Sequence, residues 1–170
     1  MKRDEIYLGN PNLKRANTPI EFTQEQILEF MACREDPVYF ARKHVKIVTL
    51  DRGLMPFEPY DFQEGLINNF HENRFNICKM PRQTGKSTTV ISYLLHYLLF
   101  NDSVNIGILA NKAATARELL GRLQTAYENV PKWMQQGVLA WNRGSLELEN
   151  GSKILAASTS ASAVRGVSFN

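Results

Sequence analysis

Apolar and polar positions along the chain predict short helices in its N-terminal third. Residues 1–18 are polar and rich in Asn, Pro, Lys and Arg, so we expect a loose arm there. Capping residues and helical spacing then predict three helices: one after the N-cap Thr23, one that starts at Asp36-Pro37, and one over Asp61–Phe70. Between the last two, Val45–Leu50 is a β-rich run that ends at the turn Asp51-Arg52-Gly53.

The middle of the chain alternates between strand-like and helix-like runs. Arg74–Lys79 and Val104–Ala110 read as short buried strands, followed respectively by an apolar helix over Ser87–Phe100 and an amphipathic helix over Lys112–Glu128. Strands that alternate with helices are typical of a parallel α/β sheet. We therefore expect the two strands to be central in a parallel sheet. Without further strands after them, their apolar edges would be unpaired and would favour aggregation.

A hairpin is predicted near the end of the chain. Two segments of alternating polarity, Ser145–Leu148 and Lys153–Ala156, flank Asn150-Gly151. An Asn-Gly pair in this position is the strongest short-range signal for a β-hairpin.

Composition narrows the class of protein only slightly. The 170 residues carry a net charge of +3 and are 44% hydrophobic, which is ordinary for a globular chain, and the mild basicity permits a polyanionic partner without establishing one. Cys33 and Cys78 are expected to be small core residues in a reducing compartment. No stretch approaches the length of an apolar membrane span, and the charged N-terminus lacks the apolar core of a secretion signal.

The segment Met80–Thr88, Met-Pro-Arg-Gln-Thr-Gly-Lys-Ser-Thr, carries the main chemical signal. It ends in Gly-Lys-Ser, like the phosphate-binding P-loop, although Met80 replaces the usual first glycine. The tripeptide alone is weak evidence for a P-loop, because a lysine at the start of an ordinary helix would give the same three residues. Its position between a predicted strand and a predicted helix is the architecture that a P-loop requires, so we expect the segment to bind the phosphates of ATP.

Each residue type in this loop suits that chemistry. Gly85 lets the backbone approach the phosphates, and the N–H groups of the loop form a cradle for negative charge. Lys86 would hold the β- and γ-phosphates, Ser87 would ligate Mg²⁺, and Thr88 would donate to the α-phosphate. The remaining loop residues expected to contact the nucleotide are Arg82, Gln83 and Thr84.

For two further residues, the sequence position leaves two alternative roles each. Arg82 lies inside the loop and would either be solvated or neutralise charge on the γ-phosphate in the manner of an arginine finger. Gln63 lies about twenty residues upstream beside Phe62, so its amide would either read the adenine edge or simply end an amphipathic helix.

With these features in place, the chain resembles the N-terminal part of the large terminase subunit of T4-like tailed bacteriophages, over roughly 36–170. The resemblance rests on Arg82–Thr88 after a non-glycine first position, on Phe62-Gln63, and on Ile108–Lys112. The longer run Trp141–Ser152, followed by Ala163–Gly166, makes it more specific than the P-loop alone.

The resemblance implies an α/β P-loop NTPase fold of the RecA/ASCE type, with an N-terminal arm and helical region over 1–50 and part of an ATPase core over 51–170. It implies a motor that uses ATP and Mg²⁺ to drive double-stranded DNA into a prohead in the host cytoplasm. Its partners would be the portal protein and the small terminase subunit, its full-length form an oligomeric ring, and it would have no membrane association. Lys86 and Arg82 would be catalytic, Gln63 would read adenine, and Arg165-Gly166 would have a sensing or coupling role.

The family's apolar Walker B strand ending in Asp-Glu, and its nuclease domain, have no counterpart in these 170 residues. We therefore expect the isolated chain to hydrolyse ATP negligibly, and steady turnover abolished by Lys86→Ala would contradict this. A superfamily-2-type helicase or restriction translocase, or a non-hydrolysing nucleotide- or DNA-binding module, are the alternatives that remain open. The following coding sequence would separate them.

Overall fold

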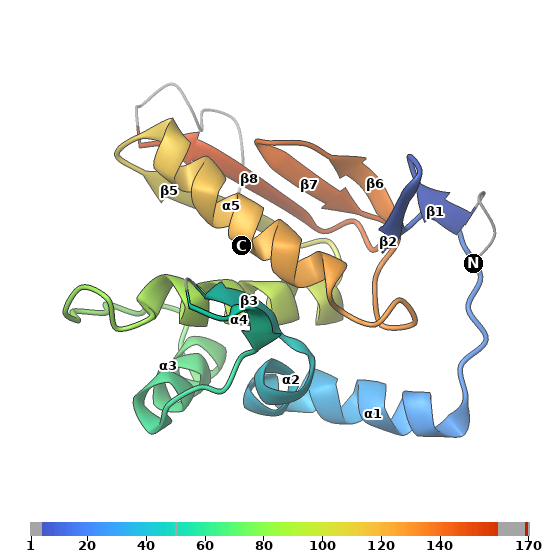
Figure 1. Ribbon diagram of the computed structural model, residues 1–170, viewed down its shortest axis with the longest axis horizontal. Helices are drawn as coiled ribbons and strands as arrows, with labels where there is room; N and C mark the ends of the chain where they lie inside the picture. Colours follow the sequence, from blue (N-terminus) through green and yellow to red (C-terminus); the bar gives the residue numbers. More distant parts are fainter. Residues whose placement is uncertain (1–4, 50, 160–168, 170) are drawn as a thin grey trace.

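A computed structural model describes residues 5–49, 51–159 and 169 and shows a mixed α/β fold (Figure 1). The helices are α1 Gln24–Glu35, α2 Pro37–His44, α3 Asp61–Glu72, α4 Lys86–Phe100 and α5 Ala113–Glu128. The strands are β1 Ile6–Tyr7, β2 Asn10–Lys14, β3 Lys46–Thr49, β4 Gly53–Pro56, β5 Asn105–Ala110, β6 Val138–Trp141, β7 Ser145–Leu148 and β8 Lys153–Ser158.

The largest sheet has four strands in the order β5-β8-β7-β6. β5 and β8 are parallel, with Asn105 opposite Lys153 and Ala110 opposite Ser158, whereas β8, β7 and β6 are antiparallel. The turn between β7 and β8 contains Asn150-Gly151, and Gly151 takes a φ of 79° that favours glycine. The predicted hairpin is therefore confirmed.

The helices stack in layers on one face of this sheet (Figure 1). α5 lies across the sheet, α4 packs beneath α5, and α3 and α2 pack beneath α4, with α1 beside α2. The core lies between these layers, where Leu95, Leu120 and Leu146 have no exposed surface. Among the described residues, no helix has the length and apolar character needed to cross a bilayer.

The capping residues place α1 and α2 where the sequence predicts them. The Thr23 hydroxyl accepts a hydrogen bond from the Gln26 backbone N–H at 3.2 Å, and the Gln26 side chain accepts one from the Thr23 N–H at 3.0 Å. At α2, the Asp36 carboxylate accepts from two backbone N–H groups, and Pro37 occupies the first helical position.

The segment before α4 differs from the prediction. Arg74–Lys79 forms no strand, and the side chains of Phe75 and Ile77 are 84% and 100% exposed. An apolar run becomes a buried strand only when neighbouring strands and helices cover it. No described strand pairs with the segment 74–79. Cys78 is therefore exposed, which corrects the expectation that it is a core residue, whereas Cys33 is buried as expected.

The predicted position of the second strand needs a similar correction. β5 is an edge strand of the four-stranded sheet rather than a central one, and β5 with β8 is the one parallel strand pair among the described strands. Ile106 and Ile108 are buried against α5, but Leu109 is 44% exposed. Only one face of β5 is covered in full by the described chain.

The N-terminal arm is also more ordered than its composition predicts. Its described part forms the β1–β2 hairpin, whose two turn residues, Leu8 and Gly9, both have positive φ. Leu13 is 1% exposed, and the Lys14 backbone N–H donates to the Gln135 side chain at 3.1 Å. Contacts between residues far apart in the sequence hold the arm against the loop before β6, and the local pattern of apolar and polar residues does not predict them.

A partly buried ion pair joins this hairpin to the sheet. Lys14 Nζ lies 2.9 Å from Glu149 Oε1, and the Glu149 carboxylate also accepts from the backbone N–H groups of Asn17 at 2.8 Å and Gly137 at 2.6 Å. Burial pushes the pKa of Glu149 up, but these hydrogen bonds and the Lys14 charge outweigh it and lower the pKa.

We expect Glu149→Gln to lower the free energy of unfolding by about 1–3 kcal/mol at pH 7, because it leaves Lys14 without its counter-charge. The folded-state pKa of Glu149 lies below the ordinary value of a glutamate, so its contribution is present above that ordinary value and is lost as the pH falls through the lowered pKa. Urea denaturation at pH 7 and pH 3 measures both effects. Glu147→Gln, at an exposed pair 3.4 Å from Lys153, is the matched control and changes stability by less than about 0.5 kcal/mol. Equal losses in the two variants would contradict this prediction.

Candidate functional site

The segment Met80–Thr88 forms an open loop that leads into the start of α4 at one end of the molecule (Figure 1). Gly85 is the N-cap of α4 and has a φ of 74°, and Gln83 has a φ of 63°. Two left-handed residues separated by one residue curl the backbone sharply ahead of the helix. The observed start of α4 at Lys86 is one residue from the predicted start.

The start of α4 presents unpaired backbone donors. Within the described residues, no hydrogen bond is made by the N–H groups of Lys86, Ser87 and Thr88, and the first helical bond is from Thr89 N to Gly85 O at 3.0 Å. Unpaired N–H groups and the helix dipole together favour an anion at this position. The loop geometry is therefore suited to a phosphate group.

Lys86 folds back over the loop that precedes it. Its Nζ donates to the Met80 carbonyl oxygen at 2.9 Å and also to the Pro81 carbonyl oxygen. The ammonium group thus links the first turn of α4 to the beginning of the loop. Phosphate oxygens are stronger acceptors than backbone carbonyls, so an anion in the curl would attract the same ammonium group.

The other loop side chains are accessible. Arg82 and Ser87 are exposed and have no hydrogen-bond or ion-pair partner in the described part of the chain. Thr88 borders a cavity of about 790 Å³ that is also lined by β3 and α5. The exposure of Arg82 is compatible with both roles considered for it, and its contact with a γ-phosphate stays a prediction.

Gln63 lies behind the loop and contacts it directly. The side chain is 4% exposed, its Oε1 accepts from the Tyr60 N–H at 2.9 Å, and its Nε2 donates to the Thr84 carbonyl oxygen at 3.3 Å. A Cβ at Gly85 would come within 2.4 Å of Gln63 Nε2 and would have to displace that amide, and the φ of 74° also favours glycine here. The adenine contact of Gln63 stays a prediction. The hydrogen bond of Gln63 to the loop backbone is a second role, which the sequence spacing does not indicate.

We expect Gln63→Leu to weaken the binding of ATP and GTP by a similar factor, about 2- to 10-fold, because it removes one hydrogen bond that holds the loop. Fluorescence titration with each nucleotide measures this. A loss confined to ATP would instead support recognition of adenine by Gln63.

Two aromatic side chains flank Gln63 on the surface. The rings of Tyr60 and Phe62 are stacked with centroids 5.8 Å apart, and the side chains are 70% and 49% exposed. The sequence pattern indicates Phe62 but not Tyr60, because Tyr60 lies in the turn before α3 and only the fold brings its ring onto that of Phe62. Exposed stacked rings near a loop of this kind offer a flat apolar surface.

Comparison with known protein families decides the family. The family model described as "Terminase large subunit, T4likevirus-type, N-terminal" matches residues 77–170, which is more than half of the chain. The chain belongs to this family. Membership in the large terminase family implies a role in viral DNA packaging, as the sequence resemblance had suggested.

The matched range separates the candidate residues into two groups. It contains all the loop candidates from Arg82 to Thr88, whereas Gln63 lies upstream of it. Arg165-Gly166 is inside the match but outside the described residues, so its predicted coupling role stays a prediction. The family match therefore bears on the loop rather than on the proposed adenine contact.

Proposed function

We propose that this terminase chain binds ATP at the Met80–Thr88 loop and forms the ATP-binding portion of a motor that moves double-stranded DNA into a prohead. The observation that carries the proposal is the start of α4, where three backbone N–H groups are unpaired in the described chain and the Lys86 side chain folds over the preceding loop. The membership in the large terminase family, whose members are generally ATPases, supports the choice of ATP among phosphate ligands.

The residues of the loop fit a nucleoside triphosphate with Mg²⁺. The β- and γ-phosphates would lie against the N–H groups of Lys86 and Ser87, and Lys86 would exchange its carbonyl contacts for phosphate oxygens. The exposed Ser87 hydroxyl is free to ligate Mg²⁺, which would offset phosphate charge. Arg82 extends from the same loop and would add a second cation on the γ-phosphate side.

The wider assembly is proposed from the family. Double-stranded DNA would be the cargo, the portal protein and the small terminase subunit would be the partners, and the assembled motor would be an oligomeric ring. The site of action would be the host cytoplasm. The net charge of +3 is compatible with a DNA partner but too small to locate a DNA-binding surface.

Isothermal titration calorimetry with ATP and Mg²⁺ tests the nucleotide-binding step. We expect ATP to bind at least tenfold more tightly than AMP, because AMP lacks the two phosphates that Lys86 and the helix N-terminus would hold. Equal affinity for the two nucleotides, or no binding of either, would contradict the proposal.

A further inference from the structure

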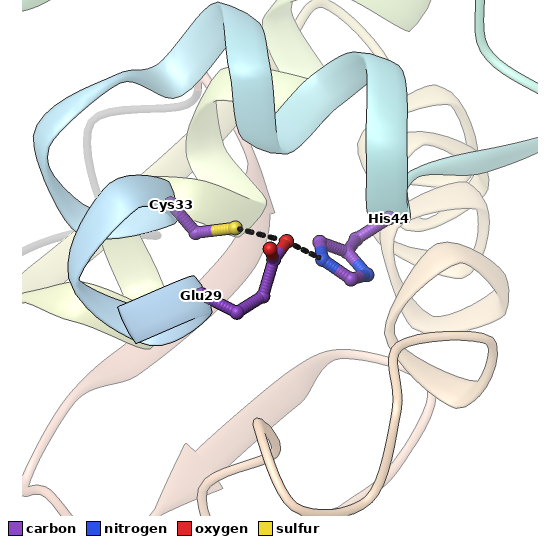
Figure 2. A group of neighbouring side chains, drawn as sticks. All are labelled: Glu29, Cys33 and His44. Carbon is purple, nitrogen blue, oxygen red and sulfur yellow. Dashed lines mark hydrogen bonds and ion pairs between the residues drawn. The ribbon is translucent and has the colours of Figure 1, made fainter. Parts of the chain in front are cut away.

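Three potential metal ligands meet where α1 packs against the end of α2 (Figure 2). Glu29 and Cys33 lie one turn apart on α1, and His44 is the last residue of α2. The Cys33 thiol donates to Glu29 Oε1 at 3.5 Å, and His44 Nε2 lies 2.7 Å from the same oxygen. All three ligand atoms lie within 4.8 Å of one another, and Figure 2 shows the side chains pointing toward a common centre.

We propose that Glu29 Oε1, Cys33 Sγ and His44 Nε2 bind a divalent transition metal of the Zn²⁺ type. Thiolate, imidazole and carboxylate are the ligands that Zn²⁺ takes in proteins, whereas Mg²⁺ prefers oxygen alone. Bonds of about 2.0–2.3 Å in a tetrahedral site separate the ligand atoms by about 3.3–3.8 Å. The observed spacing brackets this range, so small side-chain rotations would complete three corners of a tetrahedron and leave the fourth for water.

The surroundings orient the carboxylate for this role. Its second oxygen, Oε2, accepts from Lys43 Nζ at 2.6 Å and from the Tyr39 hydroxyl at 3.0 Å, which leaves Oε1 directed at Cys33 and His44. Such second contacts fix the direction of a ligand in metal sites. The Lys43 side chain is 48% exposed, so it can move into solvent as the cation arrives.

The protonation of the ligands sets how the metal would bind. Burial pushes the pKa of Glu29 up, but hydrogen bonds from Lys43, His44, Tyr39 and Cys33 bring it to about 2, so this ligand is already ionised. Burial and the nearby Glu29 charge raise the pKa of Cys33 to about 12. The metal would replace the thiol proton, forming one metal–sulfur bond and releasing that proton to solvent, and His44 would bind through Nε2 as the neutral tautomer that carries its proton on Nδ1.

A metal ion at this site would link α1 to the rest of the molecule. His44 contacts the ring of Trp133 at a centroid distance of 6.3 Å, and Trp133 also contacts Phe22 just before α1. A metal held by both helices would fasten α1 to this aromatic group. The site is independent of the proposed nucleotide site, because it shares no residue with the Met80–Thr88 loop.

Titration of the purified chain with Co²⁺ as a spectroscopic substitute for Zn²⁺ tests the site. We expect one equivalent to give a near-ultraviolet thiolate-to-cobalt band with visible d–d bands, and Zn²⁺ to displace it. The chain has only two cysteines, so Cys78→Ser, at the exposed thiol, is the matched control and should keep the spectrum. Cys33→Ser should lose the thiolate band, and His44→Asn should bind Co²⁺ at least tenfold more weakly.

The wild-type chain and Cys78→Ser alone can overturn the proposal, whatever the fold of the other variants. The absence of a thiolate band in both would leave a hydrogen-bonded contact between helices with no metal function. Loss of the band in Cys78→Ser, or its persistence in Cys33→Ser, would assign the ion to the exposed cysteine instead. A rise of several degrees in Tm on adding Zn²⁺ to Cys78→Ser is the second expected result, and an unchanged Tm would contradict it.

Discussion

Replacing Lys86 by alanine should weaken ATP binding by about 10- to 100-fold, the largest functional effect expected of any single side chain in this protein. A hydrogen bond from a charged donor contributes about 1.5–3 kcal/mol, and Lys86 is the first residue of α4, with its ammonium group on the loop that precedes the helix. Calorimetric titration with ATP and Mg²⁺ measures the change.

Lys79→Ala is the matched control, since it removes the same atoms and charge from an exposed position seven residues earlier. It should change the affinity by less than about 3-fold, as expected for a screened surface charge. Equal losses in the two variants would mean that ATP responds to the general charge of the loop rather than to a specific contact. Circular dichroism checks that both variants keep the helix content of the parent chain.

The largest effect on stability is expected at Phe40. The side chain has no exposed surface, and its ring contacts those of His96 and Phe100 at centroid distances of 5.7 and 5.4 Å. Phe40→Ala should lower the free energy of unfolding by about 3–5 kcal/mol, because it leaves a cavity between α2 and α4. Urea denaturation measures this loss, which is a large part of the stability of a typical domain.

Phe75→Ala provides the comparison that tests the unexpected segment before α4. The Phe75 side chain is 84% exposed, so its removal should change stability by less than about 0.5 kcal/mol. A loss as large as that of Phe40→Ala would show that 74–79 is packed in solution, as its apolar pattern had predicted, and would contradict the exposed conformation.

Local signals predicted local structure well. Thr23 and Asp36 are capping residues whose side chains satisfy N–H groups one turn away, and the Asn150-Gly151 turn forms within its own hairpin. The P-loop pattern also located the start of α4 to within one residue. In these cases the interactions that fix the structure lie within a few residues, so the sequence pattern contains them.

Long-range packing explains most of the differences. Apolar character marked 74–79 for burial but could not show whether another strand covers it, and Leu13 is buried only because the arm folds back onto the segment near Gln135. The contact of Gln63 with Thr84 and the approach of His44 to Glu29 also join separate elements. A single sequence carries no direct sign of such contacts.

The most direct test of the proposed ATP site is an amide ¹H–¹⁵N NMR titration with ATP and Mg²⁺. Phosphates at the start of α4 should cause the largest shifts in the backbone amides of Gly85, Lys86 and Ser87, which have no other acceptor in the described chain. Amides of α1 and α2 should move little. Saturable shifts confined to other elements, with those three amides unchanged, would contradict the assignment of the Met80–Thr88 loop as the site that binds ATP.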